Sequence, residues 1–410
     1  MFGPDLMRAF GELKAAFDPG NRMNPDKVVH PYRLDKNLDR RGWFPPEPRT
    51  FFRYPNDHGR FSHAAARCVG IGKCRGDYAG RLRPAAHYSM GWLPALALLA
   101  SAAPGAMNAA ARAPGLGRLI KRAGGIDGRR ELPRFARRRF TRWHAGRGFM
   151  KGEGEVGGGE PVLLWPDTFT NHFHPEVGQA AVAVLEDAGF RVELPGRALC
   201  CGLTWISTGQ LGVARRVLNR TIRALRPALA AGRRVVVLEP SCAAVFRSDA
   251  AELTGSGDAR LLARQTRTLA ELLTEAGWRP GASSPAGMHP GATRAIAQVH
   301  CHQHAIMGFD RDLGLLRGCG VDVDVLDRGC CGLAGNFGFE RGHYDVSVAC
   351  AEHGLWPAVR DAREDTAILA DGFSCRTQIQ AGHLGREGIH LAQLLAGMLG
   401  DHGSADENGG

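Results

Sequence analysis

Apolar and polar positions follow a regular order from residue 161 to about residue 400. Short apolar runs rich in β-branched residues are separated by longer segments in which apolar residues recur three and four positions apart. Strands that alternate with helices in this way predict parallel βαβ units and an α/β fold. The predicted strands are residues 162–165, 190–194, 235–239, 298–300, 321–326 and 366–370, and the predicted helices lie near 175–188, 209–231, 260–277, 303–317, 340–359 and 388–399.

The first 160 residues lack this alternation. Apolar residues between Leu6 and Phe17 have helical spacing and predict a helix over residues 3–17, followed by a turn-rich linker to about residue 48. The start of the chain has no basic segment followed by an apolar one, so we expect no signal peptide. We expect a mostly helical or irregular region before the α/β part.

Residues 89–111 carry no charge and include the strongly apolar WLPALALLA. Pro94 and Pro104 interrupt this stretch, and Ala, Ser and Gly dilute it. A membrane-spanning helix needs about 20 consecutive apolar residues. We therefore expect a buried or interfacial helix here rather than a membrane span.

The second half of the α/β region repeats the first half, and its cysteines mark the repeat. The matched positions are Asn171 with Cys301, and Cys200 and Cys201 with Cys330 and Cys331, all at an offset of 130, and Cys242 with Cys375 at an offset of 133. Three landmarks in one order at nearly one offset predict a duplicated unit. The predicted fold is therefore two tandem βαβ-type lobes, each Rossmann-like with a parallel sheet.

Each of these landmarks follows a predicted strand. The carboxyl ends of parallel strands meet at one edge of a sheet, where ligands bind in open α/β folds. We therefore expect the cysteines of each copy to converge in space. The second copy would bring together Cys301, Cys330, Cys331 and Cys375, whereas the first copy has three thiols and Asn171 in the fourth position.

The chemistry of these thiols has more than one interpretation. Four thiolates suit an iron–sulfur cluster or tetrahedral zinc. Adjacent cysteines favour a polynuclear cluster, because neighbouring side chains in extended backbone point to opposite faces. Buried structural cysteines are the third interpretation, since free cysteine is among the most buried residue types.

The formal net charge of +11 is unevenly distributed, with +17 on residues 1–150 and −6 on residues 151–410. The cysteine-rich part is mildly acidic, which argues against a polyanion partner for it. Residues 112–147 hold twelve Lys and Arg and two acidic residues. This segment is either a solvated helical face or a surface for anionic lipid or an acidic partner, and we do not expect it to bind nucleic acid.

The CCG motif, present twice with an upstream and a downstream cysteine, resembles the cysteine-rich domain pair of the heterodisulfide reductase B subunit and of the glycolate oxidase iron–sulfur subunit. The segments LLWPDTFTNHFHPEVG, LCCG, LEPSC, HCHQHA, CCGLAGNFG and ADGFSC are similar to bacterial proteins that fuse an FAD-linked 2-hydroxyacid (D-lactate/glycolate) dehydrogenase to such an iron–sulfur part. This resemblance covers most of residues 160–400.

The N-terminal part extends the resemblance. PDLMRAFGELKAAFDPGNRMNPDKVV resembles the last helix and tail of an FAD-linked oxidase domain, and RCVGIGKCR, with Cys68 and Cys74, resembles the opening of the family's ferredoxin-like domain. The family's flavin domain has no counterpart in these residues. The ferredoxin part also stops short, because Cys68 and Cys74 stand alone and two thiols are too few for a cubane cluster.

The comparison divides the chain into six parts. These are an oxidase tail and linker (1–48), a truncated ferredoxin-like segment (49–88), a helical basic linker (89–158), the first CCG lobe (159–285), the second CCG lobe (286–400) and a disordered tail (401–410).

The resemblance implies an iron–sulfur electron-transfer component, a subunit or fragment of an oxidoreductase. A flavoprotein partner containing FAD would oxidise glycolate or D-lactate, and a cluster of 4Fe–4S type, at least in the second lobe, would pass electrons to a quinone or a thiol/disulfide acceptor. The expected location is cytoplasmic, with peripheral contact at the inner face of the membrane through residues 112–147. The candidate metal ligands are Cys301, Cys330, Cys331, Cys375, Cys200, Cys201, Cys242, Cys68 and Cys74.

Two other functions remain open from the sequence. One is a zinc-stabilised interaction module without redox activity, which three or four thiolates per lobe would allow. The other is a degenerate remnant of the fusion enzyme, which the shortened N-terminal part suggests.

Overall fold

The computed structural model describes residues 4–20, 50, 59–60, 83–150, 159–280, 293–326 and 329–399. Helix α1 (Pro4–Phe17) belongs to a unit separate from the rest, and it confirms the helix predicted over residues 3–17. The predicted linker to residue 48, together with Cys68 and Cys74, lies outside the described residues.

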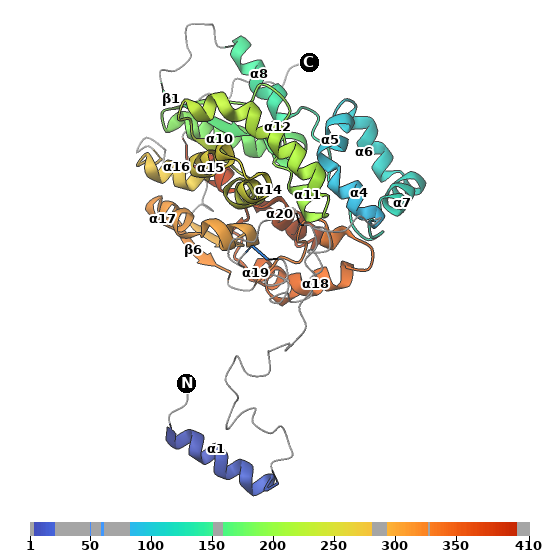
Figure 1. Cartoon of the computed structure of the whole chain (residues 1–410), viewed down its shortest axis with the longest axis vertical. Helices are drawn as coiled ribbons and strands as arrows, with labels where there is room; N and C mark the ends of the chain where they lie inside the picture. The colour runs from blue at the N-terminus through green and yellow to red at the C-terminus, as the bar shows by residue number, and fades with distance from the viewer. Residues whose placement is uncertain are drawn as a thin grey trace. The chain divides into compact units, whose positions relative to one another are not determined.

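Residues 159–399 contain two four-stranded parallel sheets that share one strand order (Figure 1). The order is β2-β1-β3-β4 in the first lobe and β6-β5-β7-β8 in the second. These matching orders confirm the α/β fold and the duplication. The strands are β1 (Glu160–Trp165), β2 (Phe190–Glu193), β3 (Val235–Val237), β4 (Thr266–Arg267), β5 (Arg294–Ala297), β6 (Asp322–Val325), β7 (Ala367–Leu369) and β8 (Gly388–Ile389).

Helices cover the sheets, and each parallel crossover contains at least one of them. In the first lobe they are α9 (Thr168–His172), α10 (Pro175–Asp187), α11 (Leu203–Ser207), α12 (Leu211–Ala230), α13 (Pro240–Ala244), α14 (Ala250–Thr254), α15 (Gly257–Gln265) and α16 (Leu269–Glu275). In the second lobe they are α17 (Asp310–Gly318), α18 (Tyr344–His353), α19 (Leu355–Asp361), α20 (Phe373–Ala381) and α21 (Leu391–Ala396). Shorter turns of π or 3₁₀ type span Val245–Asp249, Gln303–Met307 and Phe337–Phe339.

The two lobes pack through one shared hydrophobic core, in which α10 contacts α21 and buried residues of β1 and β5 belong to the same cluster. Polar bonds also cross between the lobes. Oε2 of Glu239 accepts a hydrogen bond from the backbone N–H of Phe373 at 2.9 Å, and Nε2 of His390 lies 3.1 Å from the carbonyl oxygen of Leu238. The segments that follow β3 and β7 therefore meet at the lobe interface.

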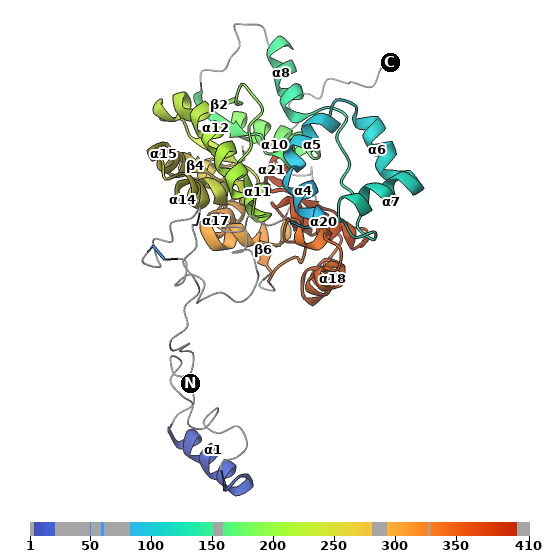
Figure 2. The same cartoon turned by 45° about the vertical axis from the view of Figure 1, so that its right-hand side comes forward.

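A layer of helices precedes the first lobe and lies on one side of it (Figures 1 and 2). Its members are α4 (Ala85–Gly91), α5 (Leu93–Ala100), α6 (Pro104–Arg112) and α7 (Pro114–Ala123), whereas α8 (Phe140–Met150) packs against α9 and α10. Within the described ranges, no individual helix is both long and apolar enough to cross a membrane, and only α5 and α6 together reach that length, with a bend of 113° between them. The apolar stretch at 89–111 is therefore broken into short helices, as its two prolines predict.

Several predicted elements differ from the structure at their boundaries. The helix predicted over 260–277 is divided into α15 and α16 by β4, because Thr268 and Glu271 form a capping box that starts a new helix. The helix predicted over 340–359 is divided at Gly354. The strand predicted at 298–300 is wrong in position, since β5 ends at Ala297, although the backbone N–H of Gln298 still bonds to Leu369.

Candidate metal centre

The two cysteine pairs lie in equivalent turns, after β2 in the first lobe and after β6 in the second. Each pair is followed by a glycine with positive φ, +86° at Gly202 and +90° at Gly332. The glycine N–H points back to the first sulfur of the pair, at 3.4 Å from Cys200 Sγ and 3.3 Å from Cys330 Sγ. Glycine suits both positions, because a left-handed backbone is costly for other residues.

A third sulfur joins each pair from the next strand–helix connection. Cys242 lies on α13 directly after β3, and its Sγ is 3.0 Å from Sγ of Cys201. Cys375 lies on α20 after β7, and its thiol is close enough to Cys331 to perturb the pKa of that residue. The structure thus brings three thiols together in each lobe, at the carboxyl edge of the sheet.

The thiols of the first lobe resist ionisation. The Cys201 thiol, followed by burial, raises the pKa of Cys200 well above its ordinary value. The pKa of Cys242 is raised to about 11, because burial and the nearby carboxylates of Asp167 and Glu239 outweigh the opposing effect of the Cys201 thiol. Adjacent thiolates repel each other unless a cation lies beside them. A metal ion bound to these thiols would supply that positive charge and would deprotonate them.

In the second lobe, the pKa values of the paired cysteines are raised as they are in the first lobe. The Cys331 thiol and burial raise the pKa of Cys330, and the pKa of Cys331 is raised because Cys375 and burial outweigh the effect of Cys330. Cys331 and Cys375 are buried, whereas Cys330 is exposed. Three thiols that perturb one another's pKa at the edge of a sheet are a candidate ligand set for an iron–sulfur or zinc centre. Among the described residues, the sulfurs of neither set of three all lie within 4.8 Å of one another.

Cys301, the fourth predicted ligand of the second lobe, is exposed and is grouped with two histidines. Its Sγ lies 3.9 Å from Nδ1 of His302, and one ligand atom from each of His300, Cys301 and His302 lies within 4.8 Å of the others. Burial lowers the pKa of His300 to about 4, which keeps its ring neutral at physiological pH. His300 was not among the predicted candidates, although the alternation His300-Cys301-His302 is visible in the sequence.

Asn171, which takes the place of a fourth cysteine in the first lobe, belongs to a hydrogen-bond chain. Its Oδ1 accepts from the backbone N–H and the hydroxyl of Thr141, both at 3.0 Å, and its Nδ2 lies 3.2 Å from Nε2 of His172. Nδ1 of His172 is 2.6 Å from Oγ of Ser101, the residue that ends α5. Asn171 therefore links α9 to the start of α8, and His172 links α9 to Ser101 at the end of α5.

Two buried carboxylates lie beside the sulfurs of the first lobe. Oδ1 of Asp167 accepts from the N–H groups of Phe169 and Thr170 at the start of α9, while its Oδ2 is buried with no partner among the described residues. Burial, with a smaller effect of Glu239, raises the pKa of Asp167. These carboxylates would add negative charge beside the thiols, which a cationic centre would balance.

The fold and these sites define a duplicated cysteine-rich α/β module. Residues 167–247 match the family model CCG, described as a cysteine-rich domain, and this match confirms the CCG resemblance. The chain is 28% identical over 262 residues to the C subunit of anaerobic glycerol-3-phosphate dehydrogenase from Escherichia coli (strain K12). The alignment covers 62% of each protein. It is 28% identical over 247 residues to lactate utilization protein A of Geobacillus kaustophilus (strain HTA426), which covers 57% of this chain and 98% of that protein.

The chain is also 34% identical over 82 residues to the B subunit of fumarate reductase (CoM/CoB) from Methanothermobacter marburgensis. This alignment covers 20% of this chain and 17% of that protein. The chain spans about three fifths of the glycerol-3-phosphate dehydrogenase subunits that it matches.

Proposed function

We propose that this chain is an iron–sulfur electron-transfer component of a dehydrogenase. The observation that carries this proposal is the grouping of three thiols at the same sheet edge in both lobes. The names of the relatives, a dehydrogenase subunit and a lactate utilization protein, support a redox role beside a dehydrogenase. An iron–sulfur cluster supplies one-electron steps, which such a component needs.

The proposed ligands are Cys200, Cys201 and Cys242 in the first lobe. In the second lobe they are Cys330, Cys331 and Cys375, with Cys301 as the fourth. The cluster type that we propose is 4Fe–4S, at least in the second lobe, where four thiols are available. The chain's own residues would hold the thiolates, and the N–H groups of Gly202 and Gly332 would donate to the sulfurs and so favour their charged form.

We further propose that the electrons come from an FAD-containing partner that oxidises a small 2-hydroxyacid, glycolate or D-lactate. The acceptor would be a quinone or a thiol/disulfide couple. Support for a lipid-soluble acceptor comes from the surface of α4–α7. Among the described residues, eight of the fourteen exposed large hydrophobic side chains lie there, namely Tyr88, Trp92, Leu96, Leu98, Leu99, Met107, Leu116 and Leu119.

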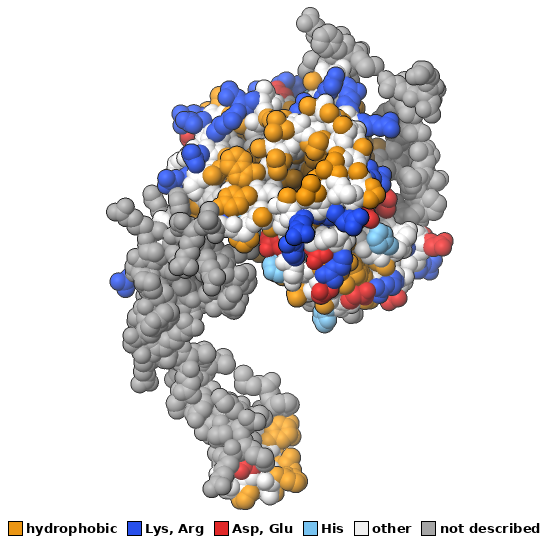
Figure 3. Space-filling model, turned by 90° about the vertical axis from the view of Figure 1, so that its right-hand side faces the viewer, with side chains coloured by type: hydrophobic (Ala, Val, Ile, Leu, Met, Phe, Trp, Pro, Cys, Tyr) orange, Lys and Arg blue, Asp and Glu red, His pale blue; other side chains and the backbone are white. Residues whose placement is uncertain are grey.

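This apolar surface is broad, and basic side chains lie around it (Figure 3). Residues 83–126 contain no acidic residue, and α7 ends with Lys121 and Arg122. Apolar side chains with basic neighbours are typical of helices that lie in the interface of an anionic membrane. We therefore propose peripheral membrane contact through α4–α7 rather than through the whole of residues 112–147.

Vesicle flotation tests the membrane contact. The full chain should float with vesicles of phosphatidylglycerol and phosphatidylcholine, and less of it should float at high salt. Leu99→Glu and Leu119→Glu change side chains that are 72% and 61% exposed, and each should reduce the floated fraction. Val346→Glu, at a position 54% exposed in the second lobe, is the matched control. Equal flotation of all four proteins would exclude this surface as the contact.

Metal analysis of anaerobically purified protein tests the electron-transfer function. Iron and acid-labile sulfide should be present, with an EPR signal that appears on reduction. Cys331→Ser should remove the iron of the second lobe, while Cys319→Ser, a half-buried thiol at the end of α17, should leave the iron content unchanged. Stoichiometric zinc without visible absorbance would instead favour the zinc-stabilised interaction module, and absence of any metal would favour a degenerate remnant.

A further inference from the structure

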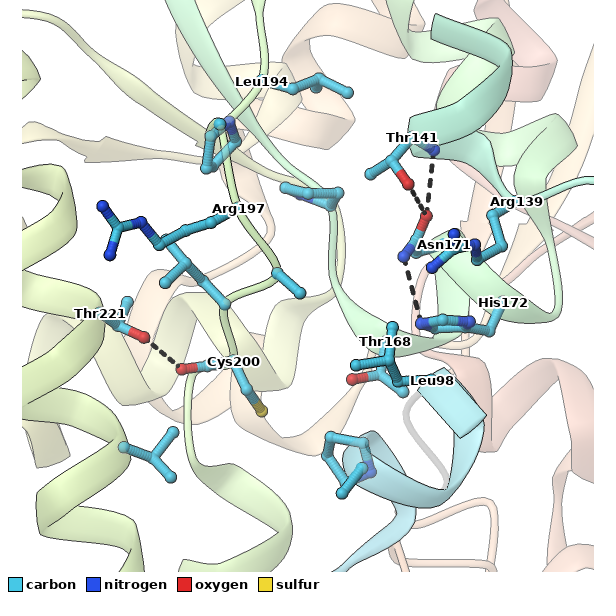
Figure 4. Close-up of a pocket in the computed structure, with 18 of the residues that line it drawn as sticks. Leu98, Arg139, Thr141, Thr168, Asn171, His172, Leu194, Arg197, Cys200 and Thr221 are labelled. Atoms are coloured by element: carbon cyan, nitrogen blue, oxygen red, sulfur yellow. Dashed lines mark hydrogen bonds between the residues drawn. The ribbon is translucent and has the colours of Figure 1, made fainter. Parts of the chain in front are cut away.

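A pocket of about 520 Å³ lies beside Cys200 in the first lobe. Its walls come from α5, from the start of α8, from the segments that follow β1 and β2, and from α11 and α12. Figure 4 shows Asn171 and His172 on one wall, Cys200 and Thr221 on the opposite wall, and the hydroxyl of Thr168 directed toward the Cys200 side chain. The pocket therefore opens beside the position where the first lobe has Asn171 instead of a fourth cysteine.

The pocket is strongly cationic. Arg139, Arg197 and Arg220 contribute to its lining, and no aspartate or glutamate does. Some other arginines of the chain form ion pairs, as Arg147 does with Glu186 and Arg191 with Glu193. Within the part of the chain that the structure describes, the guanidinium groups of the three pocket arginines have no carboxylate and no hydrogen-bond acceptor.

The arginines occupy different parts of the pocket. Arg139 is half-buried and lies beside Asn171 and His172, and its charge helps to lower the pKa of His172, after burial, to about 4 (Figure 4). Arg197 and Arg220 are exposed, so their long side chains are free to change rotamer over the opening. One half-buried and two exposed positive charges therefore surround the space.

The remaining walls are mostly apolar. They include Leu98 of α5, Leu194 and Leu199 of the segment after β2, and Trp205 of α11. Pockets of this size and lining bind small organic molecules, whose few polar groups are fixed by specific side chains. Guanidinium groups recognise carboxylates through two parallel hydrogen bonds.

We propose that this pocket binds a small organic anion, an apolar body that carries a carboxylate, with Arg139 as its main charge partner. Arg197 and Arg220 close over the anion from the rim. This inference goes beyond the electron-transfer function, because the cavity and its arginines need no metal to bind the anion.

Isothermal titration of the full chain with 1-naphthoate tests this inference, with the uncharged 1-naphthamide as the matched probe. The naphthoate should bind with a stoichiometry of one and at least tenfold more tightly than the amide. Both probes present the same apolar body, so a difference between them reports the charge alone. Equal affinity for the two probes would overturn the proposal.

Substitutions locate the binding. Arg139→Gln and Arg220→Gln should each weaken naphthoate binding, Arg139→Gln by tenfold or more. Arg138→Gln and Arg216→Gln remove the same charge from exposed side chains that do not line the pocket, and each should change the affinity less than twofold. Unchanged affinity in Arg139→Gln would refute the proposed site even if the wild type binds the naphthoate.

The outcome is independent of the metal analysis. Naphthoate binding to a protein that contains no iron would support the pocket and exclude the iron–sulfur function. Iron and sulfide in a protein that does not bind naphthoate would exclude the pocket and leave the electron-transfer function supported.

Discussion

Arg130 provides a direct test of how the second lobe is held together. Its side chain is 3% exposed and donates three hydrogen bonds, to the carbonyl oxygen of Gly338 at 2.7 Å, to Oε1 of Gln378 at 2.9 Å and to Oγ of Ser347 at 2.6 Å. Gln378 lies on α20, the helix that carries Cys375. Gly338 lies in the turn that follows the Cys330–Cys331 pair. Arg130 therefore connects the two segments that supply the sulfurs of this lobe.

We expect Arg130→Met to lower the free energy of unfolding by about 3–5 kcal/mol. A hydrogen bond to a charged group contributes about 1.5–3 kcal/mol, so loss of three such bonds sets an upper range near 5–9 kcal/mol. The substitution also removes the cost of burying a charge, which is several kcal/mol, and this gain offsets part of the loss. Methionine fills much of the space of the arginine stem, so cavity formation adds little.

Urea denaturation followed by tryptophan fluorescence measures the change, provided that the slope of the transition is the same in both proteins. Arg134→Met is the control, because Arg134 is exposed and its side chain has no partner among the described residues, and we expect a change below about 0.5 kcal/mol. Maleimide labelling of Cys331 and Cys375 should also become faster in Arg130→Met. A loss below about 1 kcal/mol, or one equal to that of the control, would refute the structural role of Arg130.

Three further predictions concern the first lobe and the turns. His172 is buried, and its pKa falls to about 4, so the unfolded chain binds a proton below about pH 6.5 that the folded chain does not. Stability should therefore decrease as the pH falls from 6.5 toward 4, by about 2–3 kcal/mol more in the wild type than in His172→Gln, as measured by urea denaturation at each pH. Glu239→Ala removes the acceptor of the Phe373 N–H and should lower the free energy of unfolding by about 1–3 kcal/mol, whereas Glu364→Ala, at an exposed position, should have no measurable effect. Gly202→Ala should cost about 1–2 kcal/mol for its positive φ alone. Gly332→Ala should cost more, because its Cβ would clash with the carbonyl oxygen of Ser347, and equal losses in thermal unfolding would contradict this comparison.

The architecture could be predicted from the sequence because it depends on local patterns that occur twice. The order of short apolar runs and helical segments predicts parallel sheets, and the offset of 130 between the cysteine pairs predicts the duplication. The convergence of Cys201 with Cys242 follows from the geometry of parallel strands, which places the ends of neighbouring strands at one edge. The two-residue strands β4 and β8 were not predicted, because so short an edge strand has no periodic signal of its own.

The sites around the cysteines could not be predicted, because they depend on tertiary contacts. The twelve basic residues of 112–147 look like one feature in the sequence, but the structure gives them different roles. Arg130 is buried in the second lobe, Arg129 pairs with Asp127 and Asp345, and Arg139 lines the pocket beside Cys200 without a partner among the described residues. An arginine that lines a cavity without any acidic side chain is better explained by an anionic ligand than by a general positive surface. A run of basic residues in the sequence therefore does not show which of them bind a ligand. That assignment requires the partner of each charge in the structure.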